Sequence, residues 1–294
     1  MDDFILTLVA SDTPLSAAHM AIIERFMGES AIMITQPPQW LKEHKAADFM
    51  LDTKPTIDHI KSLRRLFAED KIDIFVTPAA TREKKLLVAD MDSTIVDGET
   101  LDELADFAGI KDKIAAITER AMRGELDFHD ALRERVGLLK GLPQDSLQKT
   151  LERTAFNKGA QTFIKTLRDN GVTCVLVSGG FTFFTEYFAS AAGFNAHHGN
   201  ILHIEDGKLT GTVGEPILDK ESKVAYLTKY TQELGLDTTQ TMAIGDGAND
   251  LPMLQTAGQG FGYHGKPLIK DQIENCIIHG DLTAVLYALG YSDF

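Results

Sequence analysis

Two aspartates separated by one residue are the strongest candidates for chemistry in this chain. Asp90 and Asp92 follow the apolar run 86–89, so both carboxylates can be directed from the end of a buried strand into one crevice. In such a pair, one carboxylate can attack an electrophile while the other transfers protons. A solvated acidic turn explains the same residues. The start of an EF-hand calcium loop does not, because Thr94 and Ile95 stand where that loop needs Asp or Asn and then Gly.

A second polar segment can bind phosphate. Ser178, Gly179 and Gly180 follow the apolar run 173–177 and supply a hydroxyl and backbone N–H groups that no side chain obstructs. Such groups at the start of a helix bind phosphate oxygens, although an ordinary strand-to-helix turn has the same composition. Lys223 lies on a predicted helix further along the chain, and taken alone it is typical of a solvated surface lysine.

A third segment, 245–250, contains ligands for a hard cation. It follows the apolar run 241–244 and includes Asp246, Asn249 and Asp250. One carboxylate can bind the cation while the amide and the second carboxylate support it from behind. Taken alone, this segment is equally typical of a glycine-rich turn.

The elements that position these residues form one sheet. The runs 86–89, 173–177 and 241–244 are continuously apolar, as parallel strands covered on both faces are. Open parallel sheets bind ligands at the carboxyl ends of their strands, so the three polar segments are expected at one edge. Residues 99–156 between the first two strands are helical in pattern and are expected to cover the crevice as a cap. Residues 201–211 predict a β-hairpin with an Asp-Gly turn.

Residues 1–80 predict a separate small α+β domain. Apolar runs alternate with two helical stretches in the order β-α-β-β-α-β, which is the ferredoxin-like pattern. The order and length resemble the amino-acid-sensing ACT-type modules that precede some biosynthetic enzymes, and a packing or dimerisation domain explains them equally well. The expected strands are 5–10, 31–35, 46–51 and 72–76, and the expected helices are 16–27 and 57–67.

Composition and charge exclude several classes of function. The chain has 294 residues, of which 44% are hydrophobic, and its formal net charge is -14. This composition predicts a folded soluble protein of about two domains, and the negative charge disfavours nucleic acids and anionic membranes as partners. Cys174 and Cys276 lie too far apart in the sequence for a clustered zinc site and fit a reducing cytoplasm. No export signal or transmembrane segment is expected.

Taken in order, the aspartate pair, serine segment, lysine and Gly-Asp-Gly-x-x-Asp segment resemble the haloacid dehalogenase superfamily of phosphotransferases. The resemblance extends to the phosphoserine phosphatases through three segments: DMDST at 90–94, VSGGF at 177–181 and GDGAND at 245–250. It covers residues 85–294. It implies an α/β fold in which a Rossmann-like parallel-sheet core at 81–98 and 157–294 carries the helical cap at 99–156.

The resemblance also implies a mechanism. Asp90 would attack phosphorus to form an aspartyl-phosphate, and Asp92 would protonate the leaving alkoxide and then activate water. Mg2+ would be held by the carboxylates of Asp90 and Asp246 and by the backbone carbonyl of Asp92. Other implied residues bind the substrate phosphate or hold the metal segment in place: Ser178, Gly179, Gly180, Lys223, Asn249 and Asp250.

Arg135 interrupts an apolar helix face in the predicted cap. At helical spacing the same face carries three apolar residues: Phe128, Leu132 and Leu139. The guanidinium is therefore expected to be buried and to need a carboxylate partner, which an internal salt bridge would also provide. In the resembling enzymes the arginine matching Arg135 binds the substrate carboxylate and the glutamate matching Glu99 binds its ammonium. Apolar residues matching Met122 and Phe128 close over the site.

The sequence thus predicts Mg2+-dependent hydrolysis of the small molecule O-phospho-L-serine to L-serine and phosphate. A homodimer is an expected assembly of this enzyme. Two alternatives remain open at this level. One is a phosphotransferase that passes the phosphoryl group from Asp90 to an alcohol such as homoserine, and the other is an amino-acid-sensing binding protein.

Overall fold

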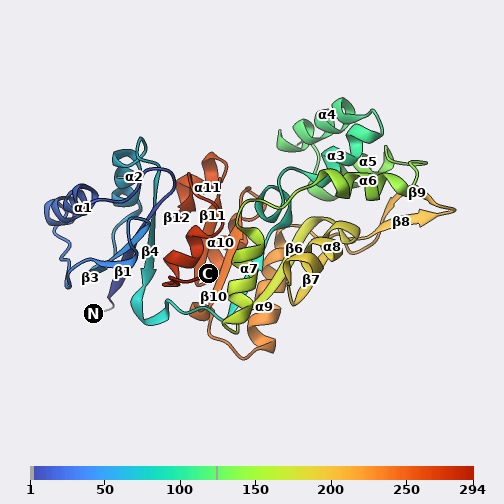
Figure 1. The fold of residues 1–294 in the computed structure, drawn as a ribbon. Helices are drawn as coiled ribbons and strands as arrows, with labels where there is room; N and C mark the ends of the chain where they lie inside the picture. The colour runs from blue at the N-terminus through green and yellow to red at the C-terminus, as the bar shows by residue number, and fades with distance from the viewer. Residues whose placement is uncertain (1–2, 124) are drawn as a thin grey trace.

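A parallel six-stranded sheet forms the centre of the protein, which a computed structural model describes over residues 3–123 and 125–294 (Figure 1). Its strands are β5 (Leu86–Ala89), β6 (Thr173–Phe181), β7 (Ala196–Asn200), β10 (Thr241–Gly245), β11 (Gln259–Tyr263) and β12 (Asn275–Ile277). Their order is β12-β11-β10-β5-β6-β7. The three strands predicted from apolar runs are therefore neighbours, with β5 between β10 and β6.

Alternate side chains of the central strands enter two separate hydrophobic cores. Leu87 and Ala89 pack into the core beneath α7 (Ala160–Asp169), α8 (Thr182–Ala192) and α12 (Ala284–Ala288). Leu86 and Val88 pack into the other core beneath α9 (Lys220–Glu233), α10 (Leu251–Thr256) and α11 (Pro267–Gln272). Successive strand residues point to opposite faces. A strand covered on both faces must therefore be apolar throughout, as the run 86–89 is.

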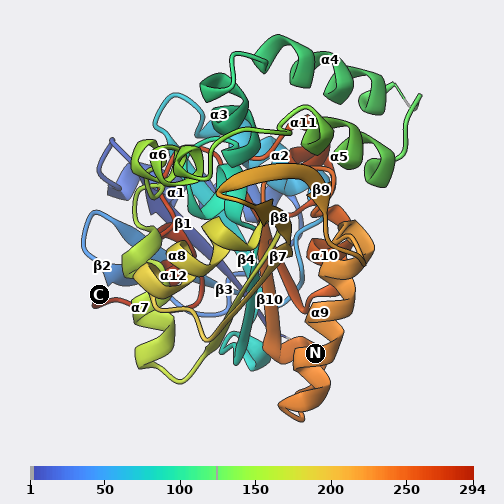
Figure 2. The ribbon, with the colours of Figure 1, turned by 90° about the vertical axis from the view of Figure 1, so that its right-hand side faces the viewer.

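Of the helices that the described chain forms between β5 and β6, four stand at the carboxyl end of the sheet, whereas α7 packs on its face (Figures 1 and 2). They are α3 (Thr100–Phe107), α4 (Lys111–Met122), α5 (Phe128–Gly137) and α6 (Asp145–Arg153). The predicted hairpin is confirmed as β8 (Leu202–Glu205) and β9 (Lys208–Val213), and it reaches this helical group. There the Gly141 N–H donates to Leu209 O at 2.8 Å. The hairpin thus contacts the helical group in addition to the two chain segments that join this group to the sheet.

The N-terminal region has the predicted ferredoxin-like topology. It consists of β1 (Phe4–Ala10), α1 (Ala17–Glu29), β2 (Gln39–Lys42), β3 (Ala46–Leu51), α2 (Ile57–Leu66) and β4 (Ile72–Pro78). Its antiparallel sheet has the order β2-β3-β1-β4 and its own hydrophobic core. Figure 1 shows this region on the β12 side of the central sheet, away from the four helices α3–α6.

The predicted strand at 31–35 is wrong. Strand β2 begins only at Gln39, and Ile34 makes no more than an isolated bridge to Leu51. Ala31 has a φ of 54° as the chain leaves α1, and Ile32 is buried in the core of the N-terminal region. The apolar residues in this run are therefore explained by packing beneath a turn.

Side chains fasten the N-terminal region to the β12 edge of the central sheet. Asn275 accepts a hydrogen bond from the Val76 N–H at 2.7 Å and donates one to the Val76 carbonyl at 3.0 Å. The buried carboxylate of Asp73 accepts from backbone N–H groups of residues 278–280. Burial raises the pKa of Asp73, and these hydrogen bonds oppose that effect.

No helix in the described part of the chain has the length and apolar character needed to cross a membrane.

Candidate active site

A buried lysine lies between two buried aspartates at the carboxyl ends of β5 and β10. Lys223, in the first turn of α9, has its Nζ 2.6 Å from Asp90 Oδ1 and 2.5 Å from Asp250 Oδ1. Only 1% of the Lys223 side chain is exposed, so water screens these contacts little. Burial lowers the pKa of Lys223, but the two carboxylates raise it more, and the lysine stays charged. Burial and the charge of Asp250 raise the pKa of Asp90, which Lys223 opposes.

Asp250 also organises the segment that precedes it. Its Oδ2 accepts hydrogen bonds from the backbone N–H groups of Asp246 and Gly247 at 3.1 and 3.0 Å. A Cβ at position 245 would lie 2.4 Å from Asp250 Cγ, so this position requires glycine. The close approach lets one carboxylate contact both the segment and Lys223.

Asp90, Asp246 and Asp250 form an acidic cluster of the kind that binds a hard cation. One oxygen atom from each lies within 4.8 Å of the others. Both Asp250 oxygens already accept hydrogen bonds from N–H donors, so Asp90 and Asp246 are the carboxylates better placed to bind an ion directly. Burial raises the pKa of Asp246, and Lys266, whose Nζ lies 3.2 Å from Asp246 Oδ2, opposes that shift.

Asp92 has different surroundings from Asp90. Its Oδ1 accepts a hydrogen bond from the Thr100 N–H at 2.8 Å, and its Oδ2 accepts one from the Ser178 hydroxyl at 3.1 Å. Burial, followed by the negative charge of Glu99, raises the pKa of Asp92 to about 6. Asp90 is thus paired with a cation, whereas Asp92 can exchange a proton near neutral pH.

The end of β6 lies against Asp92. Strand β6 continues through Gly180, so Ser178 and the two glycines belong to the strand end rather than to a loop beyond it. The Ser178 hydroxyl also accepts a hydrogen bond from the Gly180 N–H at 2.8 Å. A Cβ on Gly180 would lie 2.8 Å from Asp92 Oδ2. Glycine therefore allows the carboxylate and the strand end to approach one another.

The cap residues are less tightly held than the acidic cluster. Arg135 is partly buried, and its Nε donates to Ala131 O of its own helix at 3.2 Å. Burial lowers the pKa of Arg135, which the charges of Asp102 and Glu99 oppose. Among the described residues, no carboxylate lies within ion-pair distance of its guanidinium. Glu99 is exposed and accepts a hydrogen bond from the Ser93 hydroxyl at 2.9 Å.

The predicted apolar face of the cap is buried only in part. Leu132 and Leu139 are 2% and 1% exposed, whereas Phe128 is 39% exposed. Helix α5 ends at Gly137, so Leu139 lies beyond it. Phe128 covers Gly179, and its Cζ lies 3.4 Å from the position of a Cβ there. Phe128 covers Gly179 and therefore stays partly exposed, whereas the helical spacing of the apolar residues shows only that it shares a face with Leu132.

The structure thus brings Asp90, Asp92, Ser178, Lys223, Asp246 and Asp250 together. Asn249 is exposed at the margin of this group, with its Nδ2 3.4 Å from Asp250 Oδ1. The side chain of Met122 lies outside the described part of the structure.

Two residues near the site were missed by sequence reasoning. Lys266 contacts Asp246 and lies just after β11. Its position after the carboxyl end of another strand of the sheet could have marked it in the sequence. Asn200, buried at the end of β7, donates to Gly179 O at 2.9 Å and so fixes the backbone beside Ser178. No motif marks Asn200, because its partners are backbone groups.

Comparison with known proteins agrees with this geometry. Residues 87–255 match the family model of the haloacid dehalogenase-like hydrolases. A phosphoserine phosphatase from Streptococcus thermophilus is 47% identical over 206 residues, which are 70% of this chain and 96% of that protein. Two other curated phosphoserine phosphatases extend beyond the match, which covers 67% and 66% of their lengths.

Solved structures agree at the level of fold and family. A haloacid dehalogenase family hydrolase from Salmonella enterica serovar Typhi matches 97% of this chain and 98% of its own, with a TM-score of 0.85 and 27% identity. A phosphoserine phosphatase solved as a phospho-aspartyl intermediate analogue matches 70% of this chain and 98% of its own, with a TM-score of 0.65 and 38% identity. The chain belongs to the phosphoserine phosphatase family of the haloacid dehalogenase-like hydrolases.

Proposed function

We propose that this chain hydrolyses O-phospho-L-serine to L-serine and phosphate. The observation that carries the proposal is the buried contact of Lys223 with Asp90, next to Asp92 at the carboxyl end of the sheet. A carboxylate is a weak nucleophile towards a phosphate dianion unless nearby positive charge offsets their repulsion. Lys223 supplies that charge where Asp90 would meet phosphorus.

In the proposed reaction Asp90 attacks phosphorus in line and the bond to the serine oxygen breaks. Asp92 donates its proton to the departing alkoxide, which is a poor leaving group. Water then attacks the aspartyl-phosphate, and Asp92 takes the proton of this water, so that Asp90 is regenerated and phosphate is released. A pKa of about 6 suits Asp92 to both steps, because the group is readily protonated and deprotonated near neutral pH.

Mg2+ fits the acidic cluster, whose donors are the carboxylate oxygens that this ion prefers. Asp90, Asp246 and the backbone carbonyl of Asp92 would hold it. When bound, the ion would supply positive charge against the phosphate oxygens. Asp250 accepts a hydrogen bond from the Asp246 N–H, so its role would be to position Asp246 for the ion.

Recognition of the substrate divides between core and cap. On the core, the phosphate oxygens meet Ser178, Gly179, Gly180, Lys223 and Asn249. On the cap, Arg135 pairs with the substrate carboxylate and Glu99 with its ammonium, while Phe128 and Met122 close over the site. The absence of an ion pair to Arg135 within the described residues leaves this guanidinium available for a ligand.

The chain divides in this proposal into an ACT-like domain at 1–80, a catalytic core at 81–98 and 157–294, and a cap at 99–156. The N-terminal domain would serve regulation or dimerisation, because its ferredoxin-like sheet is built around a separate core. A cytoplasmic location is supported by the two free, buried cysteines.

Phosphate release from four substrates tests the proposal: L-phosphoserine, phosphothreonine, phosphoethanolamine and a sugar phosphate, each with Mg2+ or EDTA. We expect Mg2+-dependent release that favours phosphoserine and is abolished in Asp90→Asn. Arg135→Ala should lose the preference over phosphoethanolamine, which lacks the carboxylate. Equal rates with phosphoethanolamine and phosphoserine in the wild type would contradict the assigned substrate.

A further inference from the structure

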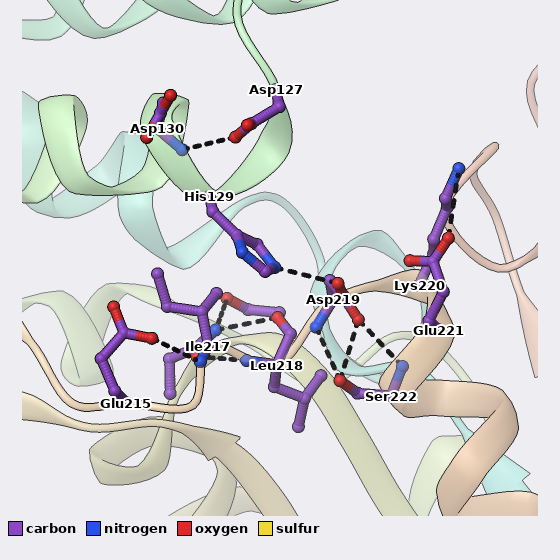
Figure 3. A network of polar contacts seen from close by, with 12 residues as sticks. Asp127, His129, Asp130, Glu215, Ile217, Leu218, Asp219, Lys220, Glu221 and Ser222 are labelled. Atoms are coloured by element: carbon purple, nitrogen blue, oxygen red, sulfur yellow. Dashed lines mark hydrogen bonds and ion pairs between the residues drawn. The ribbon is translucent and has the colours of Figure 1, made fainter.

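A histidine of the cap contacts an aspartate of the core, and the proposed reaction uses neither. His129 lies in the first turn of α5, and Asp219 precedes α9. Figure 3 shows the imidazole directed towards this carboxylate, with His129 Nε2 2.9 Å from Asp219 Oδ2. Because a carboxylate oxygen only accepts, the imidazole N–H is the donor. The contact joins segments that are 90 residues apart in the chain.

The core half of this contact is part of a helix cap. Asp219 Oδ1 accepts hydrogen bonds from the N–H and hydroxyl of Ser222, both at 2.9 Å (Figure 3). Asp219 thereby caps α9, the helix that carries Lys223 in its first turn. Burial raises the pKa of Asp219, but the hydrogen bonds from Ser222 and His129 outweigh it and keep the carboxylate ionised. One oxygen therefore serves the helix, and the other reaches the cap.

Asp219 is also tied to the strand end that carries Ser178. The preceding residue, Leu218, donates its N–H to Asn200 Oδ1 at 2.7 Å, and its carbonyl accepts from Asn200 Nδ2 at 3.2 Å. The same Asn200 amide donates to Gly179 O. Asn200 is 2% exposed, so these bonds are shielded from competing water. Asp219 thus holds a fixed position relative to Gly179.

The cap half of the contact lies next to the residue that covers Gly179. Phe128 precedes His129 and meets Gly179 from above, and Asp127 caps α5 by accepting from the Asp130 N–H at 2.8 Å. Arg135 follows two turns later on the same helix. A shift of the first turn of α5 would therefore move both the covering ring and the guanidinium.

We propose that the His129–Asp219 hydrogen bond is a latch that sets the closed position of the cap over Gly179. His129 is a positioning residue that acts through Phe128 and Arg135, and it tunes binding of the amino-acid part of the substrate. This inference rests on the proposed function. The nearby Arg133–Glu215 ion pair also joins cap and core, but its side chains are 47% and 56% exposed, against 40% and 20% for His129 and Asp219, so it should contribute less.

Kinetics with two substrates test the latch. Acetyl phosphate needs the acidic cluster but offers the cap almost nothing to bind. We expect His129→Ala to raise KM for phosphoserine about tenfold while kcat/KM for acetyl phosphate changes less than about twofold. Asp219→Ser should have the same effect, since serine still caps α9 but is too short to reach the cap. The double variant should be no worse than either single variant.

Two matched variants complete the kinetic test. His129→Gln retains an N–H donor and should recover most of the phosphoserine affinity, while Arg133→Ala should change KM less than about twofold. Equal losses with both substrates in His129→Ala would indicate general damage and overturn the proposal. So would an unchanged KM for phosphoserine.

Amide hydrogen exchange tests the latch without any substrate. We expect His129→Ala to accelerate exchange in α4 and α5 several-fold, with no change in β5 and β10, and Arg133→Ala to leave α5 protected. Unchanged exchange in α5 of His129→Ala would refute the latch. If the wild type does not hydrolyse phosphoserine, the proposed function fails, and the exchange measurement still decides whether the latch exists.

Discussion

The acidic cluster of the core and the cap above it differ in how fully their charged groups are engaged. In the core, Lys223 lies between Asp90 and Asp250, and all three side chains are at most 5% exposed. In the cap, the Arg135 guanidinium has a hydrogen-bond partner in its own helix and no ion pair with a carboxylate among the described residues, and Phe128 remains 39% exposed. Buried charges require partners within the protein, whereas partly exposed ones retain water until a ligand arrives.

This difference indicates how the two parts of the site work. Asp90, Lys223 and Asp250 hold one another in place before any substrate binds, so their geometry depends little on the cap. Asp92 differs, because it also accepts a hydrogen bond from the Thr100 N–H of the cap. The groups assigned to recognition depend on where the cap sits. Substitutions in the core should therefore lower turnover of every phosphate ester, and substitutions in the cap should act mainly on the amino-acid part of the substrate.

The largest expected effect is that of Lys223→Met. It removes the charge that contacts both buried carboxylates, Asp90 and Asp250, so we expect turnover to fall by at least about 10³-fold with both phosphoserine and acetyl phosphate. A lysine at the other end of β5 provides the matched control. Lys84 is 1% exposed, donates to two backbone carbonyls, and has a pKa lowered by burial to about 8.

Lys84→Met should therefore change thermal stability but leave turnover within about twofold of the wild type, because this lysine lies far from the strand ends that carry the site. Steady-state assays and thermal unfolding of both variants check this pair. Comparable turnover in Lys223→Met and the wild type would remove the basis for assigning the reaction to Asp90.

Two neighbouring glycines allow the contributions of core and cap to be tested separately, because one faces Asp92 of the core and the other faces Phe128 of the cap. Gly180→Ala would place a Cβ 2.8 Å from Asp92 Oδ2, and we expect kcat to fall by about 10- to 100-fold because the carboxylate must move. Gly179→Ala would place a Cβ 3.4 Å from the Phe128 ring, which is ordinary van der Waals contact, and should raise KM for phosphoserine with little loss of kcat. Steady-state kinetics distinguish the two. Equal losses of kcat would mean that cap and core are not separable there.

The sheet and its strand-end residues were predictable from the sequence for a physical reason. A strand buried on both faces must be continuously apolar, so 86–89, 173–177 and 241–244 stood out, and polar residues at their ends had to meet at one edge. The ferredoxin-like order of the N-terminal region was predictable in the same way. The run 31–35 was not a strand, because apolar residues beneath a turn give the same pattern.

Contacts between distant segments were not predictable. Asn200 binds backbone carbonyls, and His129 meets Asp219 through the placement of two helices, so neither leaves a spacing in the sequence. The exposure of Phe128 and the partial burial of Arg135 depend on where the cap sits, and helical periodicity reports only which residues share a face. The sequence around Lys223 does not distinguish it from a surface lysine, and its role follows from its contacts with Asp90 and Asp250.

A smaller effect concerns the stability of the metal-free protein. The pKa of Asp92 is raised from 3.8 to about 6, so between these pH values the folded state binds more protons than the unfolded state. The free energy of unfolding therefore falls as pH rises through this window and is not recovered above it. Asp92→Asn should remove this slope and be the more stable protein at pH 7 to 8. Urea unfolding across pH, with the exposed Asp112→Asn as control, measures it.

The smallest effect tests the link between the exposed margin of the cap and the core carboxylate. Glu99 is the second cause, after burial, of the raised pKa of Asp92, so Glu99→Gln should lower that pKa by a few tenths of a unit to about one unit. Carbon NMR of the Asp92 carboxyl in the metal-free protein reports it directly, with Glu103→Gln, in the helix that follows Glu99, as control. An unshifted titration would mean that burial alone sets the Asp92 pKa. The core would then be more independent of its cap than the contacts around Glu99 indicate.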